Sequence, residues 1–339
     1  MLYSLIRSVL FLLPPEQAHN VALKGIDLIP SALKPQRIED PVEVMGLRFP
    51  NRVGLAAGLD KDAKHVYGLA KLGFGFVEVG TLTPRAQMGN PKPRLFRLPK
   101  ARAIINRMGF NNEGVDRAVV RLSRRPHDLV IGVNIGKNKD TPNDDAARDY
   151  IYGLNSVWPV ADYITVNVSS PNTPDLRQLQ FGEELRRLLD LLKEQQALLE
   201  QEYGFYRPIL LKVAPDLEER DISRIAQAVS ESGMDGLIAT NTTISRDGVS
   251  GLRHADEAGG LSGAPLTDKS TEVIRSFRSA LPARIPIIGA GGIMDGESAA
   301  QKIRAGASLV QLYTGLVYRG PKLVTEAALA CRDACENRQ

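Results

Sequence analysis

The segment SSPNT, residues 169–173, places hydroxyl side chains that could move a proton beside an asparagine that could hold a polar ring. It follows residues 163–168, in which apolar and polar side chains alternate as they do in a buried strand. Serine, proline and asparagine at the end of a strand often form nothing more than a turn. The segment is therefore a turn, a reactive site or both, and the choice depends on what the other strand ends carry.

Eight short apolar runs alternate with amphipathic helical segments between about Pro50 and the C-terminus. This alternation predicts a parallel sheet wrapped by helices. A helix runs through a glycine into a strand in three places, LGFGFVEVG, SGMDGLIAT and AGASLVQLY. Eight strands with crossover helices favour an α/β fold, a (β/α)8 TIM barrel, over an open doubly wound sheet. The expected strands are residues 53–57, 76–80, 130–134, 163–168, 209–213, 236–240, 286–289 and 309–313.

The carboxyl ends of these expected strands carry an unusual concentration of polar side chains and glycine. In a TIM barrel this end of the strands is the functional face. Two lysines and three asparagines there exceed what structural turns alone require: Lys61, Lys212, Asn134, Asn167 and Asn241. We therefore interpret this face as a site. In chain order its segments are GLAAGLDKD, GTLTP, NIGKN, NVSSPNT, LKVAPD, ATNTT, GAGGI and YTG.

Three glycine-rich segments at the same face indicate a phosphorylated ligand. GAGGI, residues 289–293, and YTG, residues 313–315, follow the last two strands, whose loops commonly bind phosphate in TIM barrels. GGLSG, residues 259–263, offers a further close approach of backbone N–H groups to an anion. Each cluster alone is equally consistent with a turn, but the three together favour a phosphate site.

Composition and charge limit the partners of this chain. Its 339 residues are 43% hydrophobic, which is enough for a large core, and the formal charge of +4 suits an anionic small molecule or lipid surface. The sequence has no dense run of lysine and arginine, so we expect no nucleic acid partner. Cys331 and Cys335 are the only cysteines, and the four histidines lack metal-ligand spacing, which predicts no metal site.

The N-terminal segment MLYSLIRSVLFLLPP is the most apolar part of the chain. Its helical spacing is broken by Pro14 and Pro15, so it is too short to span a bilayer, which takes about 20 apolar residues. Residues 16–29 form a second amphipathic pattern. These two expected helices either pack on the main domain or lie in a membrane interface. A secretory signal is disfavoured because Arg7 lies inside the segment and no A-x-A site follows.

Several of these motifs together resemble dihydroorotate dehydrogenases of the quinone-dependent class (class 2). They are GLAAGLDKD, NRMGFNN, NIGKNKDTP, NVSSPNTPDLRQLQ, ATNTT, GGLSG, GAGGI and ASLVQLYTG, and the resemblance covers essentially the whole chain. NRMGFNN and SSPNTP together are highly specific, whereas GAGGI alone is not. The resemblance implies an FMN-dependent oxidoreductase that oxidises (S)-dihydroorotate to orotate in de novo pyrimidine (UMP) biosynthesis. Reduced FMN would then be reoxidised by a membrane quinone.

The resemblance also implies how the chain is organised. A short helical extension, residues 1–38, would provide membrane and quinone access, and residues 39–339 would form the FMN-binding catalytic barrel. His19, Arg97 and Tyr313 match positions near the quinone tunnel. We expect a monomer that is associated peripherally with the cytoplasmic face of the inner cell membrane.

Cofactor and substrate residues follow from the same resemblance, position by position. FMN would be bound by Ala57, Gly58, Leu59, Asp60, Lys61, Thr81, Asn134, Asn167, Lys212, Thr240, Gly263, Gly292, Tyr313 and Thr314. Dihydroorotate or orotate would be bound by Lys61, Asn106, Arg107, Met108, Gly109, Phe110, Asn167, Asn172, Asn241 and Thr242. An asparagine side chain offers both a donor and an acceptor, which suits the amide-like ring of this substrate.

Ser170 matches the catalytic base of the family, which removes the C5 proton of the substrate while a hydride passes to FMN. A serine hydroxyl is a weak base unless another group activates it, and we expect Thr173 and an ordered water to carry the proton away. The soluble classes use cysteine at this position, so Ser170 and the N-terminal helices both favour quinone over NAD or fumarate as acceptor. The loop from Ser170 through Phe181 is the expected lid.

Lys212 ends an apolar run, and a buried lysine requires a partner. The resemblance places it at the electron-rich edge of the flavin ring, where a cation stabilises the reduced form. The rival interpretation is a Schiff-base lysine of an aldolase. For the chain as a whole, a soluble NAD-linked relative, a colourless phosphosugar lyase or isomerase, and a non-catalytic membrane-binding module compete with the quinone enzyme.

Overall fold

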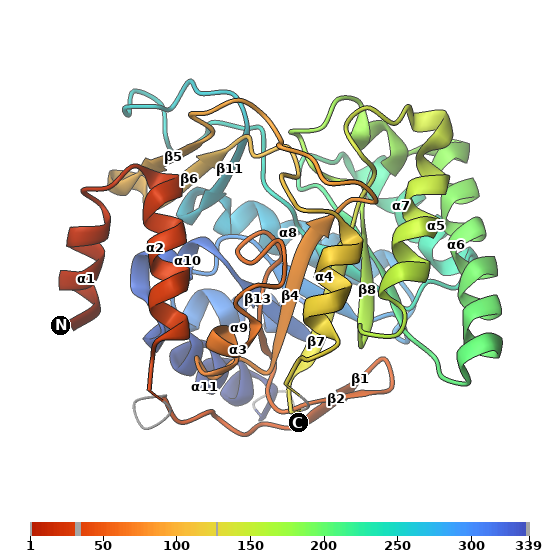
Figure 1. Cartoon of the computed structure of the whole chain (residues 1–339), viewed down its shortest axis with the longest axis horizontal. Coiled ribbons are helices and arrows are strands. Elements are labelled where there is room, and N and C mark those ends of the chain that lie inside the picture. Colours follow the sequence, from red (N-terminus) through yellow and green to blue (C-terminus); the bar gives the residue numbers. More distant parts are fainter. Residues whose placement is uncertain (1, 31–34, 127, 337–339) are drawn as a thin grey trace.

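The computed structural model describes residues 2–30, 35–126 and 128–336, and a closed barrel of parallel strands forms its centre (Figure 1). The barrel strands are β3 (Val53–Leu55), β4 (Phe76–Leu82), β7 (Val130–Ile135), β8 (Tyr163–Asn167), β9 (Ile209–Val213), β10 (Gly236–Ala239), β12 (Ile287–Ala290) and β13 (Leu309–Leu312). Around the barrel they follow the order β10-β12-β13-β3-β4-β7-β8-β9, and every neighbouring pair is parallel. The eight carboxyl ends therefore meet at one rim.

The TIM barrel predicted from the sequence is confirmed, and closure excludes the open sheet. The ends of each expected strand differ from the observed ends by at most two residues, and 209–213 is identical to β9. Gly73, Gly233 and Gly306 lie between a helix and the following strand with φ of 89°, 73° and 114°. Since L-residues rarely adopt such values, these glycines end the helices as the three repeated helix–glycine–strand segments predicted.

Two sheets outside the barrel were not expected. β1 (Val42–Val44) and β2 (Leu47–Phe49) form an antiparallel hairpin, and β5 (Leu95–Leu98), β6 (Ala103–Asn106) and β11 (Gly260–Gly263) form a three-stranded antiparallel sheet. Most of GGLSG is therefore an edge strand, which the sequence analysis did not predict for this segment. The sheet lies beside the rim of the barrel, and the segment NRMGFNN begins where β6 ends (Figure 1).

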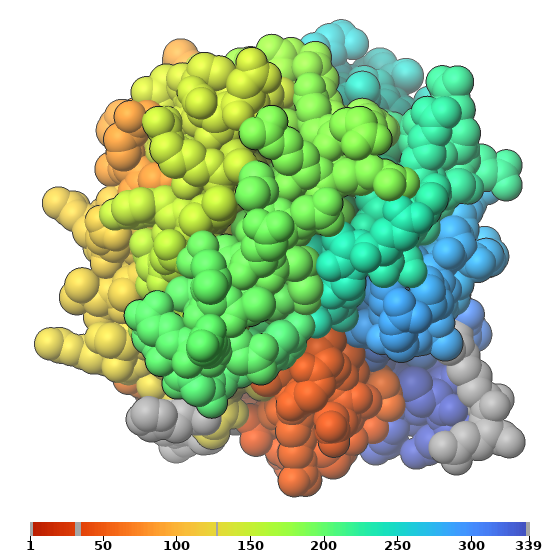
Figure 2. Space-filling view, turned by 90° about the vertical axis from the view of Figure 1, so that its right-hand side faces the viewer, coloured from red at the N-terminus to blue at the C-terminus, as the bar shows by residue number. Residues whose placement is uncertain are grey.

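Helices cover the outside of the barrel between successive strands. Figure 2 shows the side that α5 to α7 cover, with the orange β1–β2 hairpin beneath them. The helices after β3 are α3 (Val66–Ala70), α4 (Val115–Leu122), α5 (Ala146–Val157), α6 (Gly182–Tyr203), α7 (Glu219–Glu231), α8 (Thr267–Ala280), α9 (Gly296–Arg304), α10 (Thr314–Arg319) and α11 (Lys322–Glu336). Short 3-10 helices are η2 (Pro99–Ala101), η3 (Asn143–Asp145), η4 (Leu176–Gln180) and η5 (Ala264–Leu266).

Two N-terminal helices, α1 (Leu2–Leu10) and α2 (Pro15–Asp27), lie along one flank of the barrel (Figure 1). The Tyr3 hydroxyl donates to the carbonyl of Val317 at 2.8 Å, which ties α1 to α10. Residues 1 and 31–34 of the expected extension lie outside the described residues. Within the described part of the chain, no helix is both long enough and apolar enough to cross a membrane.

Aromatic side chains close the amino-terminal end of the barrel. Phe49 of the hairpin packs edge-on against Phe76 with ring centroids 5.2 Å apart, and Phe76 packs against Tyr163 at 6.3 Å. All three side chains are fully buried. These three side chains form an aromatic plug. Gly54 leaves room for it, because a Cβ atom at position 54 would lie 2.3 Å from the Phe76 ring. Ligands therefore reach the barrel from the opposite rim.

The plug generates a prediction for stability. Gly54→Ala should lower the apparent Tm by roughly 2–8 °C, because the Phe76 ring is held on both sides and overpacking a core typically costs about 1–3 kcal/mol. Gly25→Ala is the matched control, since a Cβ atom at that position in α2 meets nothing within 4 Å. Thermal unfolding followed by circular dichroism measures both. Equal shifts for the two variants would contradict the role assigned to the plug.

Candidate active site

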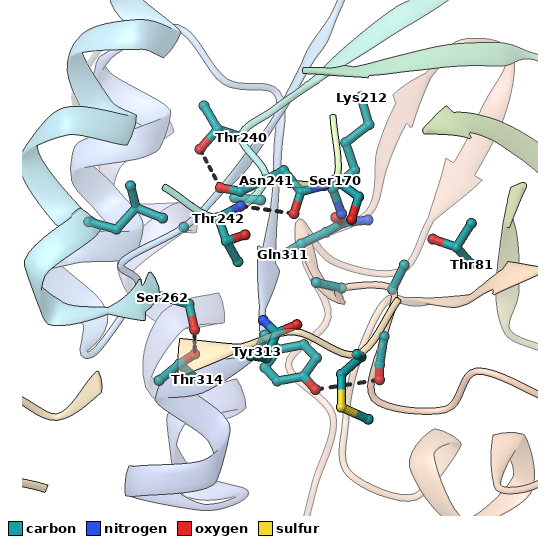
Figure 3. Close-up of a pocket in the computed structure, with 18 of the residues that line it drawn as sticks. Thr81, Ser170, Lys212, Thr240, Asn241, Thr242, Ser262, Gln311, Tyr313 and Thr314 are labelled. Atoms are coloured by element: carbon teal, nitrogen blue, oxygen red, sulfur yellow. Dashed lines mark hydrogen bonds between the residues drawn. The ribbon is translucent and has the colours of Figure 1, made fainter. Parts of the chain in front are cut away.

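A cavity at the carboxyl rim of the barrel brings together most of the site residues predicted from the sequence (Figure 3). They project into it from the ends of barrel strands and from β6 and β11. The predicted residues that line the cavity are Ala57, Gly58, Lys61, Thr81, Asn106, Met108, Gly109, Phe110, Asn167, Ser170, Asn172, Lys212, Thr240, Asn241, Thr242, Gly263, Gly292, Tyr313 and Thr314.

Four predicted site residues lie outside this cavity: Leu59, Asp60, Arg107 and Asn134. The carboxylate of Asp60 accepts hydrogen bonds from the backbone N–H groups of Lys64 at 2.9 Å and His65 at 2.7 Å, so it holds the loop after β3. Leu59 lines a second cavity, described below. The guanidinium of Arg107 forms an ion pair with Glu257 at 2.6 Å. The backbone of Arg107 directly follows Asn106, which lines the cavity.

Asn134 lies one layer beneath the cavity and supports residues that line it. Its side-chain oxygen accepts hydrogen bonds from the Thr81 hydroxyl and, at 3.2 Å, from the Asn167 amide. The Asn167 amide also donates to Thr81 Oγ1 at 3.0 Å. Because these groups are buried and bonded to one another, they fix the orientation of the Asn167 side chain at the floor of the cavity.

Glu78, in β4, has a fully buried carboxylate that lies below the layer formed by Thr81, Asn134 and Asn167. It accepts hydrogen bonds from the Asn134 amide at 2.8 Å, the Tyr163 hydroxyl at 3.0 Å and the Gln311 amide at 2.7 Å. Burial lowers the pKa of Lys212, and the charge of Glu78 opposes that decrease. The partner of the buried Lys212 is therefore the charge of Glu78, because the Lys212 ammonium donates no hydrogen bond to the described residues.

Ser170 lies in the loop after β8 and is almost fully buried. Its Oγ accepts a hydrogen bond from the backbone N–H of Asn172 at 3.2 Å. Arg177 holds the loop in place, because its guanidinium donates to the carbonyls of Ser169 at 3.1 Å and Thr242 at 2.8 Å. Thr173 Oγ1 is buried and has no hydrogen-bond partner in the described part of the chain.

The predicted asparagines converge from different elements. The Asn172 amide donates to the side-chain oxygen of Asn106 at 3.3 Å, which connects the loop after β8 to the end of β6. The Asn241 amide donates to the hydroxyl of Ser169 at 3.0 Å and to the side-chain oxygen of Asn167 at 3.4 Å. The cavity thus presents several amide donors and acceptors within one region, as a small polar ring would require.

Glycines at the other side of the cavity bring backbone close together. A Cβ atom at Gly292, where φ is 70°, would lie 2.3 Å from the backbone of Thr267, and one at Gly263, where φ is 103°, would lie 2.3 Å from the Arg102 carbonyl oxygen. The hydroxyl groups of Ser262 and Thr314 are 2.8 Å apart beside them. This geometry is typical of a backbone cradle for an anion.

Lys61 contributes positive charge to the same cavity. Its ammonium donates to the carbonyl of Gly58 at 2.9 Å. Burial, followed by the charge of nearby Arg94, lowers the pKa of Lys61 to about 8. The lysine is therefore mainly protonated at neutral pH, and an anion that contacts it would stabilise the charged form.

A second, mainly apolar cavity lies between α1, α2 and the barrel, and the three residues predicted near a tunnel all line it: His19, Arg97 and Tyr313. Burial, aided by the charge of Lys61, lowers the pKa of His19 to about 4, so its imidazole is neutral. The Arg97 guanidinium donates to the carbonyls of Leu10 and Phe11 at 3.3 and 3.2 Å, which fixes the end of α1. Tyr313 lines both cavities.

Several residues of the site were missed in the sequence. Gln311 lines the first cavity and Glu78 lies beneath it. Ser262 and Gly291 also line the cavity; they belong to the predicted segments GGLSG and GAGGI but were not singled out. A lone acid inside the apolar run FVEVG was a signal for Glu78, whereas nothing in the pattern separates Gln311 from a solvent-facing strand residue. Among the described residues, no group of three or more histidine, cysteine, aspartate or glutamate side chains converges to hold a metal ion.

Comparison with known families gives a match along most of the chain. The sequence model of the family described as "Dihydroorotate dehydrogenase" matches residues 41–329. A curated relative from Marinobacter nauticus, "Dihydroorotate dehydrogenase (quinone)", is 58% identical over 336 residues, which cover 98% of this chain and 99% of that protein. A relative of the same name from Thiobacillus denitrificans is 57% identical over 330 residues, covering 96% of this chain and 98% of that protein.

Solved structures give the same picture for the fold. A ligand-free DHODH from Eimeria tenella superposes with a TM-score of 0.88 at 40% identity, covering 96% of each chain. A crystal structure of DHODH from the same organism in complex with ferulenol has a TM-score of 0.87 at 40% identity, covering 96% of this chain and 91% of that one. The similarity includes nearly the whole length of both chains.

Proposed function

Because the chain belongs to the dihydroorotate dehydrogenase family, we propose that the cavity at the barrel rim is where this FMN-dependent oxidoreductase oxidises dihydroorotate to orotate, with a quinone as the final acceptor. One observation carries the proposal: the expected base Ser170, the expected asparagines, Lys61 and Lys212 line a single cavity. Family membership excludes a lyase and a non-catalytic membrane module. The relatives named as quinone enzymes favour quinone over NAD.

The residues present fit FMN. The backbone cradle at Gly263 and Gly292 suits the phosphate, and Thr314 lies beside it. Lys212 is a buried cation without a hydrogen-bond partner among the described residues, and it suits the electron-rich edge of the ring. Seven further expected FMN contacts line the cavity: Ala57, Gly58, Lys61, Thr81, Asn167, Thr240 and Tyr313. The other three, Leu59, Asp60 and Asn134, lie outside it. When bound, FMN supplies the acceptor for a hydride.

Ser170 is the base in this proposal and takes the C5 proton of dihydroorotate while the hydride leaves the neighbouring carbon. The N–H of Asn172, 3.2 Å from Ser170 Oγ, stabilises negative charge that develops on that oxygen. Thr173 Oγ1 forms no hydrogen bond with the described residues. It is therefore suited to pass the proton onward through a water.

Substrate recognition depends on the convergent amides and on Lys61. Asn106, Asn172, Asn167 and Asn241 present donors and acceptors to the ring, with Thr242 and the backbone of residues 107–110 beside them. Lys61 supplies the positive charge for the substrate carboxylate. All of these residues belong to one chain, and we propose that the enzyme acts as a monomer.

The second cavity is the proposed quinone site. It is mainly apolar, and it meets the first cavity at Tyr313. α1, α2 and the turn between them expose Leu5, Val9, Leu12 and Val21, which suits attachment to a membrane that contains quinone. We therefore assign residues 1–38 to quinone access at the cytoplasmic face of the inner membrane and residues 39–339 to catalysis.

The base and its relay are tested by anaerobic stopped-flow reduction of FMN by dihydroorotate. Ser170→Ala should slow flavin reduction by about 10²–10⁴-fold, the usual contribution of a general base. Thr173→Val should slow it by roughly tenfold, because the proton loses its onward path. Ser156→Ala is the control and should leave the rate unchanged, because this half-buried serine lies on α5, outside the cavity, and its hydroxyl donates to the carbonyl of Tyr152. A Thr173→Val enzyme that reduces flavin at the native rate would refute the relay.

Orotate affinity should depend on pH through Lys61. The pKa of Lys61 is about 8 without substrate, so its ammonium is present below that pH and is lost above it. Orotate should therefore bind up to about tenfold more weakly at pH 9 than at pH 7, measured by the perturbation of the flavin spectrum. In Lys61→Met the affinity should be lower and nearly constant over this range. An unchanged pH dependence in that variant would assign it to another group.

Removal of residues 1–35 should reduce quinone turnover far more than flavin reduction by dihydroorotate. Ala22→Phe should act in the same direction because Ala22 lines the second cavity, whereas Gln17→Phe, on the exposed side of α2, should have little effect. Steady-state quinone assays and stopped-flow flavin reduction separate the two half-reactions. If both fell equally in every variant, the helices would serve as structural support and not as a quinone site.

A further inference from the structure

Lys302 is a fully buried lysine on α9 that lies behind the glycine cradle and not in the cavity itself. Its side chain passes close to the barrel, because a Cβ atom added at Gly289 would lie 3.1 Å from Lys302 Cβ. A buried lysine is costly unless its ammonium is fully hydrogen-bonded. The mechanism proposed above does not use it.

Three acceptors surround this ammonium. They are the Thr267 carbonyl oxygen at 2.7 Å, Ser270 Oγ at 2.6 Å and Thr271 Oγ1 at 2.6 Å. Burial lowers the pKa of Lys302 to about 7, and the carboxylate of Asp268 opposes that decrease. The three N–H donors of the charged form match the three acceptors, whereas a neutral amine has only two, so the arrangement favours the cation.

The same acceptors hold the cradle. Ser270 Oγ accepts from Lys302, so its single hydrogen is free to donate, and the Gly291 carbonyl oxygen lies 2.8 Å away. The Thr267 hydroxyl donates to the Gly292 carbonyl oxygen at 2.7 Å. Lys302 therefore fixes the Ser270 hydroxyl and the Thr267 backbone, and these two residues fix successive carbonyl groups of the glycine pair.

The hydrogen bonds to the Gly291 and Gly292 carbonyl groups also orient the N–H groups of the cradle. In a trans peptide the C=O and the next N–H point in opposite directions. With the Gly291 and Gly292 carbonyls bound to residues behind the loop, the N–H groups of Gly292 and Ile293 point toward the cavity that both residues line. Neither N–H donates to another described residue, which leaves two convergent donors for an anion.

On the basis of the proposed function, we propose that Lys302 is a positioning residue that sets the affinity of the cradle for the FMN phosphate, acting through Ser270 and Thr267. A phosphate bound by the N–H groups of Gly292 and Ile293 would also be attracted by the positive charge of Lys302 behind the loop. The effect should be confined to the phosphate, because Lys302 contacts none of the residues assigned to the flavin ring.

The test compares FMN with riboflavin, which has the same ring and lacks the phosphate. Apoprotein is prepared from the native chain, Lys302→Met, Ser270→Ala and the matched control Lys137→Met, which removes another buried lysine whose ammonium instead donates to the Thr141 carbonyl. Quenching of flavin fluorescence gives the Kd for each ligand, circular dichroism reports folding, and the phosphorus-31 resonance of bound FMN reports the cradle directly.

Lys302→Met should raise the Kd for FMN by roughly tenfold, leave that for riboflavin within about twofold and shift the phosphorus resonance. Ser270→Ala should change the ratio of the two Kd values in the same direction, and Lys137→Met should not change it. An unaltered ratio in Lys302→Met would overturn the inference; if that variant did not fold, an unaltered ratio in Ser270→Ala would do so. A native apoprotein that bound neither ligand would instead refute the proposed function.

Discussion

The buried carboxylate of Glu78 is the interaction on which the site depends. A carboxylate in the closed interior of a barrel is tolerated only if its oxygens are hydrogen-bonded and its charge is opposed. Here the carboxylate accepts hydrogen bonds from three other strands, through Asn134, Tyr163 and Gln311. Its charge also opposes the decrease that burial causes in the pKa of Lys212, on a fourth strand. The Glu78 carboxylate therefore holds the layer that orients Thr81 and Asn167, and it favours the charged form of Lys212 at the wall of the cavity.

The two cavities divide the chemistry between two kinds of environment. The cavity at the rim is rich in amides, hydroxyls and backbone N–H groups, whereas the one beneath α1 and α2 is mainly apolar. Tyr313 belongs to both, and burial raises the pKa of its hydroxyl to about 12, so it remains neutral where the cavities meet. In the proposed function, the polar substrate and the apolar acceptor therefore bind in different cavities.

The sequence predicted the barrel and most of the cavity because both depend on local patterns. Apolar runs with polar ends mark buried parallel strands, and SSPNT is at once a turn and the place where Ser170 and Asn172 enter the cavity. The pairing of β11 with β6 was missed because these two short strands lie far apart in the sequence. β5 and β6 form a local hairpin that the sequence analysis did not identify. Lys302 was missed because a lysine on an amphipathic helix is indistinguishable from one that faces water. Asp60 was predicted to contact FMN, and in the structure its carboxylate accepts hydrogen bonds that hold the loop after β3.

The central claim is that one cavity binds FMN and oxidises dihydroorotate. The visible absorption spectrum of the purified native protein, recorded before and after anaerobic addition of dihydroorotate, tests it most directly. The account predicts a flavin spectrum that bleaches on addition of the substrate. A flavin that remained oxidised would contradict the assignment of the substrate, and a folded protein without flavin that could not be loaded with FMN would contradict the assignment of the cofactor.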